Sequence, residues 1–518
     1  SDPLSIQNGV LVTNATRYPM MIDPQAQAIT WIANLEAERM PSFGIISLNN
    51  NRLKENLEFA MCEGMAFMIK DVEETLDPML DPVLDKAITK KGKTMFITVA
   101  DQPLEYNPDF QMYFITRLPN PHFSPELQAK TTVIDFTVTM KGLEEQLLGH
   151  VIGKEQQALE EQLNEVLATV TNNTKALLLL DAQLLDRLTS NKGNLLDDEE
   201  LIGVLANTKA KAAEVKIKLK EASETKENIG QKREIYRDVA TRGSILYFAI
   251  VEMSLVNAMY QTSLFQFLAI FMDSMNKAER ANLASKRVVN IIETMTYMVY
   301  RYINRGLYEV DKLTFILLTL MKILSTAGLL TPEDVGLLLR GGAALDINGV
   351  RKNPMLWMPS DVWLNILKLS GDIAYFRTLP DTIIRNEAMW KRWYEENEPE
   401  STPVPDLEAE LTGDPRLGHW RRLLLIRCLR MDRTTLAAKT FIQNTEQMGE
   451  RYIEPVVDTV ESVADDMTAT IPVIYLLSVG ADPTEMIENL ARKNKQTVAV
   501  ISMGEGQEPF ALAALRQA

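Results

Sequence analysis

Two stretches of the sequence have the order strand, turn, helix that a phosphate-binding loop requires, but both lack the residues that bind phosphate. Such a loop has the pattern G-x-x-x-x-G-K-[ST]: glycines let backbone N–H groups face the phosphates, Lys neutralises charge, and Ser or Thr holds the metal. In RYPMMIDPQAQAITWI (17–32) an apolar strand ends at Ile22, and Asp23, which follows it, would repel a phosphate. The turn and the helix start, where Gly, Lys and Ser or Thr are needed, read Pro24, Gln25, Ala26, Gln27 and Ala28.

The second such stretch is IPVIYLLSVGADPTEMIENLA (471–491). It keeps Gly480, but Ala481, Asp482 and Pro483 follow, and no basic residue occurs before Arg492. We therefore predict that both corners are degenerate nucleotide loops, which keep the shape of the site without its chemistry.

An acidic turn follows the apolar run 66–69 and loosely resembles the Asp-Glu pair with which an ATPase binds its metal and orients water. Lys70 interrupts the run, and Asp71 and Glu73 have the wrong spacing. We interpret this segment as a strand followed by a solvated acidic turn.

Other catalytic or metal-binding patterns are absent from the sequence. It contains no G-x-S-x-G, no H-E-x-x-H and no Cys-His pair at a useful spacing. Cys62 and Cys428 are far apart, and His122, His150 and His419 show no ligand spacing. We expect no catalytic residues, no metal site and a reducing compartment.

The composition is that of a soluble globular protein of about three domains. Of 518 residues, 46% are hydrophobic, and the formal net charge is −16, which disfavours nucleic acid and anionic membranes as partners. The chain starts without Met and without a secretory signal, so we expect a piece of a longer protein. The uncharged stretch 253–272 is as long as a bilayer span, but its six polar residues favour a buried helix.

The first part of the chain predicts an α/β domain. Apolar runs at 20–22, 66–69, 95–99 and 111–116 are typical of buried strands, and helical patterns lie at 28–38 and 52–62. Strands that alternate with helices favour a parallel sheet. A second α/β pattern is expected near the end, with strands at 423–427, 473–477 and 497–502 and a helix at 434–445.

Long helical periodicity runs from 143 to 340. One heptad register is occupied by Leu201, Leu205, Ala212, Val215, Leu219, Ala222, Ile229 and Tyr236. With a turn at 237–244 and a return helix at 245–272, this pattern predicts an antiparallel hairpin projecting from a helical base. Periodicity alone fits an ordinary helix bundle equally well.

Seven segments resemble dynein heavy chains, in the order found there. RYPMMIDPQAQAITWI, FMIKDVEETLDPMLDPVL, FQMYFITRLPNPHFSPE and TVTMKGLEEQLLG are similar to the fifth AAA+ module, and LLLIRCLRMDR, IPVIYLLSVGADPTEMI and VAVISMGEGQEPFAL to the sixth. The stretches 134–149 and 120–131 are closer to axonemal outer-arm than to cytoplasmic chains. The similarity covers nearly the whole chain.

The resemblance implies an α/β plus α fold: AAA+ P-loop-like modules with a long antiparallel helical hairpin and a helical small subdomain. It implies the large part of the fifth module at 1–145, helices of its small subdomain at 146–197, and the strut or buttress with its return helix at 198–275. The remaining small-subdomain helices would lie at 276–345, and a truncated large part of the sixth module at 346–518.

In function, the resemblance implies a non-catalytic segment of a motor ring that braces the microtubule-binding stalk. ATP or ADP and Mg would be bound in other modules, so we expect no cofactor here. The partners would be neighbouring modules, the stalk, other dynein chains and, through the stalk, the microtubule of an axoneme. The strut would comprise the heptad residues from Leu201 to Tyr236, with Arg237, Asp238 and Arg242 at its tip.

The resemblance also gives single residues a meaning. Asn120 follows the strand 111–116, where AAA+ ATPases keep a polar sensor residue, and we interpret it as structural. Arg17 and Arg117 are candidates for ion pairs between domains. Two alternatives remain: an active P-loop NTPase, which would bind Mg-ATP, and a helical adaptor unrelated to a ring, which would have no α/β sheet.

Overall fold

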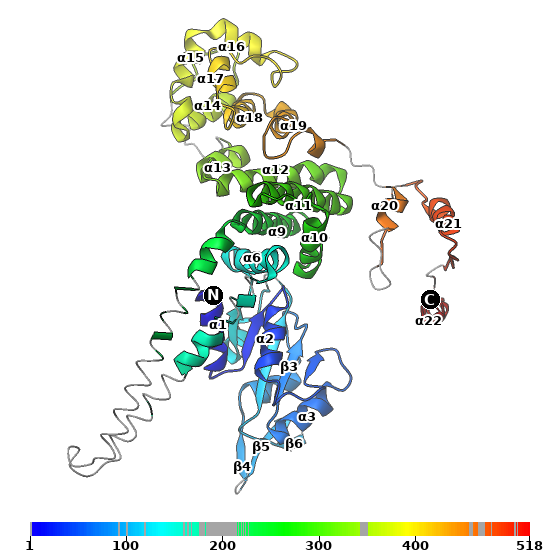
Figure 1. Ribbon diagram of the computed structural model, residues 1–518. Coiled ribbons are helices and arrows are strands. Elements are labelled where there is room, and N and C mark those ends of the chain that lie inside the picture. The colour runs from blue at the N-terminus through cyan, green and yellow to red at the C-terminus, as the bar shows by residue number, and fades with distance from the viewer. Residues whose placement is uncertain are drawn as a thin grey trace, which may run out of the picture.

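The computed structural model describes most of the chain. The described residues are 3–91, 94–99, 102–118, 121–158, 161–162, 165–166, 168–175, 182, 215, 217–218, 220, 222, 224–225, 227–341, 351–454, 459–464, 472–477, 479–501, 504 and 506–517. An α/β domain lies at one end, and a stack of helices extends from it (Figure 1).

The α/β domain is built on a five-stranded parallel sheet with the order β2-β3-β7-β1-β8. Its strands are β1 (Pro19–Ile22), β2 (Ile45–Ser47), β3 (Ala66–Lys70), β7 (Gln111–Thr116) and β8 (Thr132–Asp135). In the register, Met20 of β1 lies opposite Phe114 of β7 and Val133 of β8. The strands predicted at 20–22, 66–69 and 111–116 are confirmed, whereas the short strands β2 and β8 were not predicted.

Helices cover both faces of this sheet. Neighbouring residues of each strand point to opposite faces, so each face enters its own buried cluster. Phe67, Met112 and Phe114 enter one buried cluster, and Met68 and Tyr113 enter the other. The covering helices are α1 (Pro3–Thr13), α2 (Gln27–Leu35), α3 (Leu53–Glu63), α4 (Asp81–Leu84), which follows the 3-10 turn η1 (Pro78–Leu80), and α5 (Pro125–Lys130). Helices α2 and α3 confirm the two helical patterns predicted here.

The strand predicted at 95–99 exists, but it is not part of the parallel sheet. It is β5 (Thr94–Val99), the middle strand of an antiparallel sheet with β4 (Thr89–Lys91) and β6 (Gln102–Glu105). An apolar run does not specify its pairing partner, and here only two residues separate β5 from each neighbouring strand, which favours antiparallel pairing.

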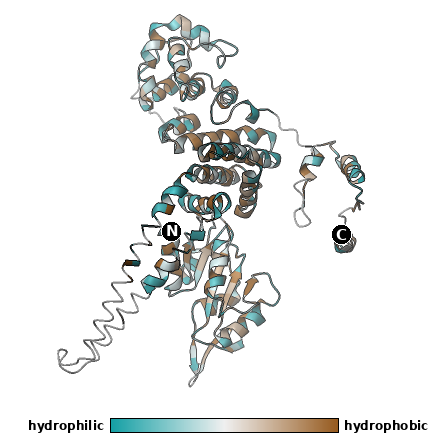
Figure 2. Cartoon of the chain, in the orientation of Figure 1, coloured by the Kyte–Doolittle hydropathy of each residue, from teal (hydrophilic) through white to brown (hydrophobic). Residues whose placement is uncertain are grey.

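The helical stack has one continuous core from Val138 to Tyr452. The apolar side chains of this core are buried, and Figure 2 shows that the helices of the stack carry many hydrophobic residues. The stack comprises α6 (Met140–Glu155), α9 (Arg237–Val256), α10 (Leu264–Lys277), α11 (Ala284–Gly306), α12 (Glu309–Thr326), α13 (Pro332–Arg340), α14 (Ser360–Asp372), η3 (Ala374–Phe376), α15 (Leu379–Arg385), α16 (Glu387–Tyr394), α17 (Glu408–Gly413), α18 (Gly418–Leu429), η4 (Met431–Arg433), α19 (Thr434–Gln443) and η5 (Glu450–Tyr452).

Two of the expected boundaries fall inside helices, at 145/146 in α6 and at 275/276 in α10. The boundary at 345/346 separates helices that share one core.

The turn predicted at 237–244 is wrong. These residues form the first turns of α9, where Val239, Ala240 and Gly243 are buried. The return helix predicted at 245–272 is two helices, because α9 ends at Val256 and α10 starts at Leu264. Within the described part of the chain, α9 is the one helix long and apolar enough to cross a membrane, and it packs against α6, α11 and α12.

The strand predicted at 423–427 is also wrong, since Leu423, Leu424 and Leu425 are buried in α18. The expected strands at 473–477 and 497–502 are not formed at their described residues, and Ser502 lies outside them. After residue 458 the described elements are the helices α20 (Val460–Ala464), α21 (Thr484–Lys493) and α22 (Glu508–Gln517). The apolar segment around Ile474 has no neighbouring strand among the described residues with which its backbone could form hydrogen bonds. Ile474 and Val479 are exposed. The helix predicted at 434–445 is confirmed as α19.

Candidate functional site

The corner between β1 and α2 has an anion of its own at the start of the helix. Asp23 follows β1, and its side chain accepts hydrogen bonds from three successive backbone amides: Oδ1 from Gln27 N at 2.9 Å, and Oδ2 from Ala28 N at 2.8 Å and Ile29 N at 3.3 Å. The chain reaches this position because Ala26 adopts a left-handed conformation with φ 59°. The amides of a helix start, which would otherwise lack partners, are thereby bound by a carboxylate.

The Asp23 carboxylate is fully buried, with 0% of its surface exposed. Burial raises the pKa of Asp23 above its usual value, while the amides of Gln27, Ile29 and Ala28 and the charge of Arg117 act in the opposite direction. A buried carboxylate is tolerated when hydrogen bonds replace its lost hydration. The sequence indicated that Asp23 would repel a phosphate, but not that its carboxylate binds the amides at the start of α2. Residue spacing along the chain does not show where a side chain points.

The acidic turn after β3 is joined to the end of β7. Asp71, with φ 57°, pairs with Arg117 Nε at 3.0 Å. Since β3, β7 and β1 are neighbours, Asp71, Arg117 and Asp23 all lie at the carboxyl edge of the sheet, where ligands bind in open α/β folds. We expected Arg117 to form an ion pair between domains, but its pair with Asp71 lies within the α/β domain. Arg17, the other candidate for such a pair, is exposed. Glu73 is exposed too, and Asn120 lies outside the described residues.

The same corner contacts the helical stack through its two glutamines. Gln25 Oε1 accepts from the backbone N–H of Val138 at 3.3 Å, and the Gln25 side chain shares a hydrogen bond with the hydroxyl of Tyr247 in α9. Gln27 Nε2 donates to Gln146 Oε1 in α6 at 3.2 Å. The turn that would enclose a triphosphate in an ATPase thus joins the sheet to the helices.

The second corner is an open turn. Gly480 has φ 87°, and Ala481 and Pro483 precede α21. Asp482 Oδ1 accepts from the N–H of Thr484 at 2.9 Å and from its hydroxyl at 2.6 Å. A carboxylate again binds the start of a helix, but no strand leads into this turn at residues 472–477.

The predicted strut residues are only partly described, since Leu201, Leu205, Ala212 and Leu219 lie outside the described residues. Val215 is half-buried in a helical segment, while Ala222 and Ile229 are buried. Tyr236 is buried in the core of the helical stack. Three of the four described heptad positions are thus buried, and the assignment of these residues to a strut stays a prediction.

The residues assigned to the tip lie in the first turns of α9 instead, within the helical stack. Arg237 pairs with Glu144 at 2.7 Å and Glu145 at 2.9 Å in α6, and also with Glu234. Arg242 donates to Gln447 Oε1 at 2.9 Å and to the Thr296 hydroxyl at 3.4 Å. Asp238 is exposed in the first turn of α9, where its charge suits the helix dipole. Their predicted location is wrong because the preceding helical segment ends in a turn at Ile235 and Tyr236, and α9 starts directly after it at Arg237.

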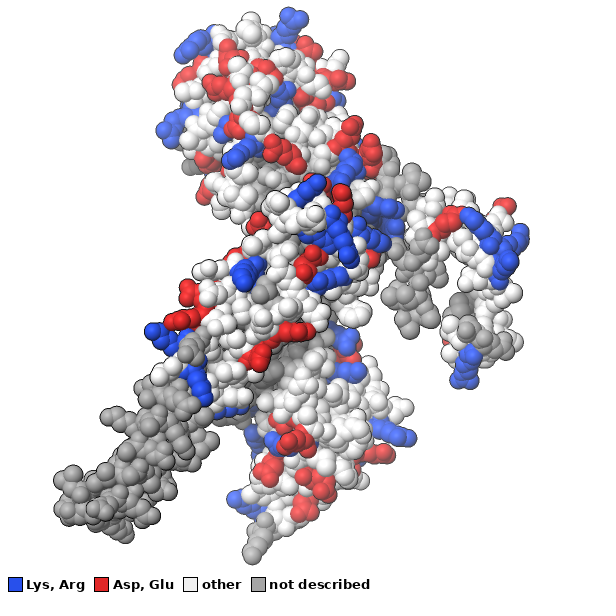
Figure 3. All heavy atoms as spheres, in the orientation of Figure 1, with Lys and Arg blue, Asp and Glu red and all other residues white. Residues whose placement is uncertain are grey.

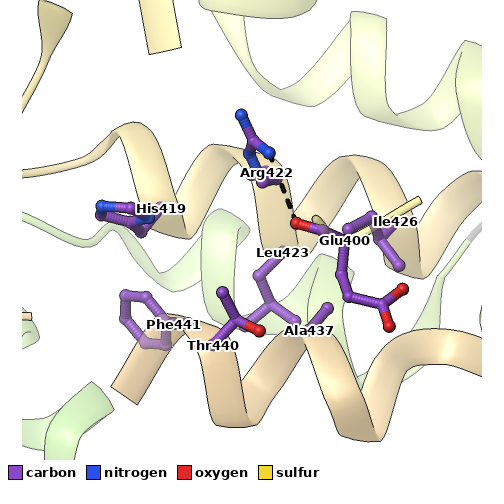
Figure 4. A pocket seen from close by; sticks show the side chains of 8 residues that line it. All are labelled: Glu400, His419, Arg422, Leu423, Ile426, Ala437, Thr440 and Phe441. Atoms are coloured by element: carbon purple, nitrogen blue, oxygen red, sulfur yellow. Dashed lines mark hydrogen bonds between the residues drawn. The ribbon is translucent and has the colours of Figure 1, made fainter. Parts of the chain in front are cut away.

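Two hollows in the described part of the chain are alternative candidate sites. The first, of about 10 Å³, lies between α18 and α19 and is lined by Glu400, His419, Arg422 and apolar side chains (Figure 4). That volume holds about one water molecule. The second, of about 400 Å³, is an open groove beside Arg17, Lys86 and Lys130, and Lys130 is already paired with Asp81 at 3.0 Å.

Charge is unevenly distributed on the face shown in Figure 3. Lys and Arg gather where α11 and α12 lie below α19. Arg451 lies 5.1 Å from the ring centres of both Tyr297 and Tyr452 in this region.

Within the described residues, no group of three or more His, Cys, Asp or Glu side chains could hold a metal ion.

Comparison with protein families places this sheet in a known class. Residues 1–215 match the family model described as the ATP-binding dynein motor region, and residues 468–518 match the dynein heavy chain region D6 P-loop domain. The parallel sheet and its corner lie in the first match, so this part is an α/β module of the AAA+ class. A helical adaptor without an α/β sheet is thereby contradicted.

The chain belongs to the dynein heavy-chain family. It is 46% identical to the dynein gamma chain of the flagellar outer arm from Chlamydomonas reinhardtii, over 99% of this chain and 11% of that protein. It is 45% identical to mouse dynein axonemal heavy chain 5 over 100% of this chain, and to human axonemal heavy chain 8 over 98%, again with 11% of each relative covered. These relatives fit the outer-arm resemblance, and the chain spans about a tenth of their length.

Proposed function

We propose that this chain is a non-catalytic segment of a dynein motor ring, which relays ATP-driven rearrangement of the ring through the strut to the microtubule-binding stalk. The parent would be a minus-end-directed motor of the ciliary or flagellar cytoskeleton. Its ATP or ADP and Mg would be bound in other modules. Its partners would be the neighbouring modules, the stalk, other dynein chains and the microtubule. The axonemal relatives support this assignment.

One observation carries the non-catalytic part of the proposal. The amides that start α2 are bound by Asp23, a residue of the same chain that is fully buried. A triphosphate at this position would need those donors, and two anions would repel each other strongly in a buried place. This geometry disfavours an active P-loop NTPase at the first corner.

A continuous set of contacts supports the relay. The corner bonds to Gln146 in α6 and to Tyr247 in α9. Helices α6 and α9 pack closely against each other, and Arg237 joins α6 to Glu234 at the end of the preceding helical segment. That segment carries Ile229 and belongs to the proposed strut. A displacement of the sheet would therefore move the base of the strut.

The test replaces a buried seam residue by Lys in the complete motor. Ile229 is 4% exposed, and we expect Ile229→Lys to destabilise the hairpin by about 2 kcal/mol or more, because it buries an unpaired charge. Leu205→Lys and Leu219→Lys, on the same heptad register, should act alike. The measured quantity is the rate of ATP-induced release from microtubules, expected to fall roughly tenfold, with basal ATP hydrolysis retained.

The matched control is Ile217→Lys, since Ile217 is 60% exposed in the same segment. This variant should release microtubules at the normal rate. Normal release by all three seam variants, with the hairpin shown to be disrupted, would refute the relay.

A further inference from the structure

Arg242, in the second turn of α9, is a half-buried cation without a counter-charge among the described residues. Its guanidinium donates to the side-chain oxygen of Gln447 at 2.9 Å and to the hydroxyl of Thr296 at 3.4 Å, and both acceptors are neutral. Burial lowers the pKa of Arg242, because a charge is less stable away from water. Within the described part of the chain, no Asp or Glu forms an ion pair with this guanidinium.

Two other arginines of the helical stack that are removed from water do have a carboxylate partner. Arg287 pairs with Glu155 at 2.7 Å, and Arg433 pairs with Glu400. A charge that leaves water without such a partner raises the free energy of the fold. Arg242 therefore indicates a place for an anion that the described residues do not supply.

Arg451, an exposed residue of η5, brings a second positive charge to the same place. Its guanidinium lies 5.1 Å from the ring centre of Tyr452 and donates to the hydroxyl of that residue at 3.4 Å. Burial raises the pKa of Tyr452, and the charges of Arg451 and Arg242 both oppose this effect, so both cations lie near this phenol. The described residues give Arg451 no ion pair with a carboxylate either, and Glu293 on α11 acts on Tyr452 more weakly than the two arginines.

Tyrosine contacts hold the two cations in a fixed relation to each other. The hydroxyl of Tyr300 in α11 donates to the carbonyl oxygen of Tyr452 at 3.0 Å, and the ring centres of these residues are 5.0 Å apart. A site whose groups are already ordered loses less conformational entropy when it binds a ligand. Figure 3 shows Lys and Arg gathered in this region, on a chain whose formal net charge is −16.

We propose that Arg242 and Arg451 form a docking site for an acidic segment of the same heavy chain, one that lies outside these 518 residues. The two cations belong to different elements and flank one tyrosine, so they suit two carboxylates of one segment better than a single small anion. Guanidinium groups bind carboxylates through paired, charge-assisted hydrogen bonds. The chain spans 11% of each outer-arm relative, so most of the polypeptide that could supply this segment lies beyond it.

Binding of hexaglutamate to the full 518-residue chain tests the chemistry of the site. Fluorescence anisotropy of a labelled peptide at low salt measures the dissociation constant. We expect saturable binding that weakens roughly tenfold or more in the double variant Arg242→Gln/Arg451→Gln, because two charge-assisted contacts are lost. Arg451→Gln alone, at an exposed position, should weaken binding several-fold and serves if the double variant does not fold.

The matched control removes two positive charges elsewhere on the helical stack. Arg280 and Lys286 are exposed, and Arg280→Gln/Lys286→Gln changes the net charge by the same amount. This variant should bind hexaglutamate as the unaltered chain does. Equal weakening by the two double variants, or the absence of hexaglutamate binding, would overturn the proposal, as would binding of inorganic phosphate in preference to the peptide.

Hydrogen exchange tests whether the acidic segment belongs to the same heavy chain. The peptide 442–454, which carries Arg451, should exchange several-fold more slowly in the complete heavy chain than in the 518-residue chain. Arg242→Gln/Arg451→Gln should abolish this difference, and the control variant should retain it. Equal exchange in the two unaltered proteins would overturn the assignment to the same heavy chain. The relay is judged by the release of microtubules, so its failure is distinguishable from failure of this proposal.

Discussion

Buried charges in this chain are held by several partners each. Asp23 has three backbone amides, and Arg287, which is 6% exposed, binds Glu155 at 2.7 Å and the carbonyl oxygens of Met275 and Ala278 at 2.8 Å. A buried ion costs several kcal/mol unless such bonds replace its hydration. At the residue scale, polar side chains therefore fix where α2, α6 and α11 meet their neighbours.

His419 gives a prediction about pH. Burial, and secondly the charge of Arg422, lower the pKa of His419 below 6.5, against the weaker effect of Glu408. The unfolded chain then takes up a proton near pH 6.5, whereas the folded protein does so only at lower pH. The stability associated with neutral His419 is complete above pH 6.5 and is lost as the pH falls toward the folded pKa.

We expect His419→Gln to reduce this loss. The measurement is the free energy of unfolding by urea at about pH 7.5 and about pH 5.5, on either side of the ordinary histidine pKa. The difference between the two values should be smaller for the variant than for the unaltered chain. Identical differences would show that His419 titrates normally.

Close packing at the element scale depends on the absence of a side chain in α9. A Cβ at Gly243 would lie 2.9 Å from Leu147 Cδ1 in α6 and 2.9 Å from Phe271 Cε2 in α10. Helices approach this closely only where one of them presents a small residue, and added atoms force the neighbours apart. Gly243 therefore sets the separation of α6, α9 and α10, of which α6 and α9 are bonded to the corner.

Gly243→Val should destabilise the helical stack by about 1–3 kcal/mol through overpacking. The matched control is Gly230→Val, since a Cβ at this helical glycine meets nothing within 4 Å, and its effect should stay within about 0.5 kcal/mol. Urea unfolding followed by circular dichroism measures both. Equal stability of the two variants would contradict the packing argument.

At the scale of the whole molecule, sheet and helices are joined by few contacts, and the base of the proposed strut lies close to them. Gln25 and Gln27 connect the corner to the stack, and Arg237 connects α6 to the segment before α9. One core then extends from Val138 to Tyr452. Movement of the sheet can reach distant helices because this core is continuous and closely packed.

Arg237→Gln should loosen the strut base. Without the guanidinium, the carboxylates of Glu144, Glu145 and Glu234 lie close together and repel one another, at a cost of about 1–2 kcal/mol. We expect hydrogen exchange of residues 227–236 in the full chain to accelerate several-fold at low salt and less at high salt, because screening weakens the repulsion. Lys232→Gln, at an exposed position in the same segment, is the control. Equal exchange in the two variants would refute this role of Arg237.

Several features of this protein follow from local residue types alone. Continuous apolar runs specified β1, β3 and β7, because parallel strands are buried on both faces. The lack of Gly, Lys and Ser or Thr at 24–28 predicted a degenerate corner without reference to the fold. Ile229 and Tyr236 stand at apolar helical spacing in the sequence, and both are buried, because such spacing gathers apolar residues on one face of a helix.

Where these elements meet depends on contacts between distant parts of the folded chain. The apolar run 423–427 fits a buried strand or a buried helix equally, and the packing of α18 against α14 and α19 selects the helix. The direction of the Asp23 carboxylate, the ion pair between Asp71 and Arg117 and the bond from Gln27 to Gln146 join residues of different elements. Local propensity acts over a few neighbouring residues, whereas these contacts form once the chain has brought distant segments together, which is why sequence patterns do not contain them.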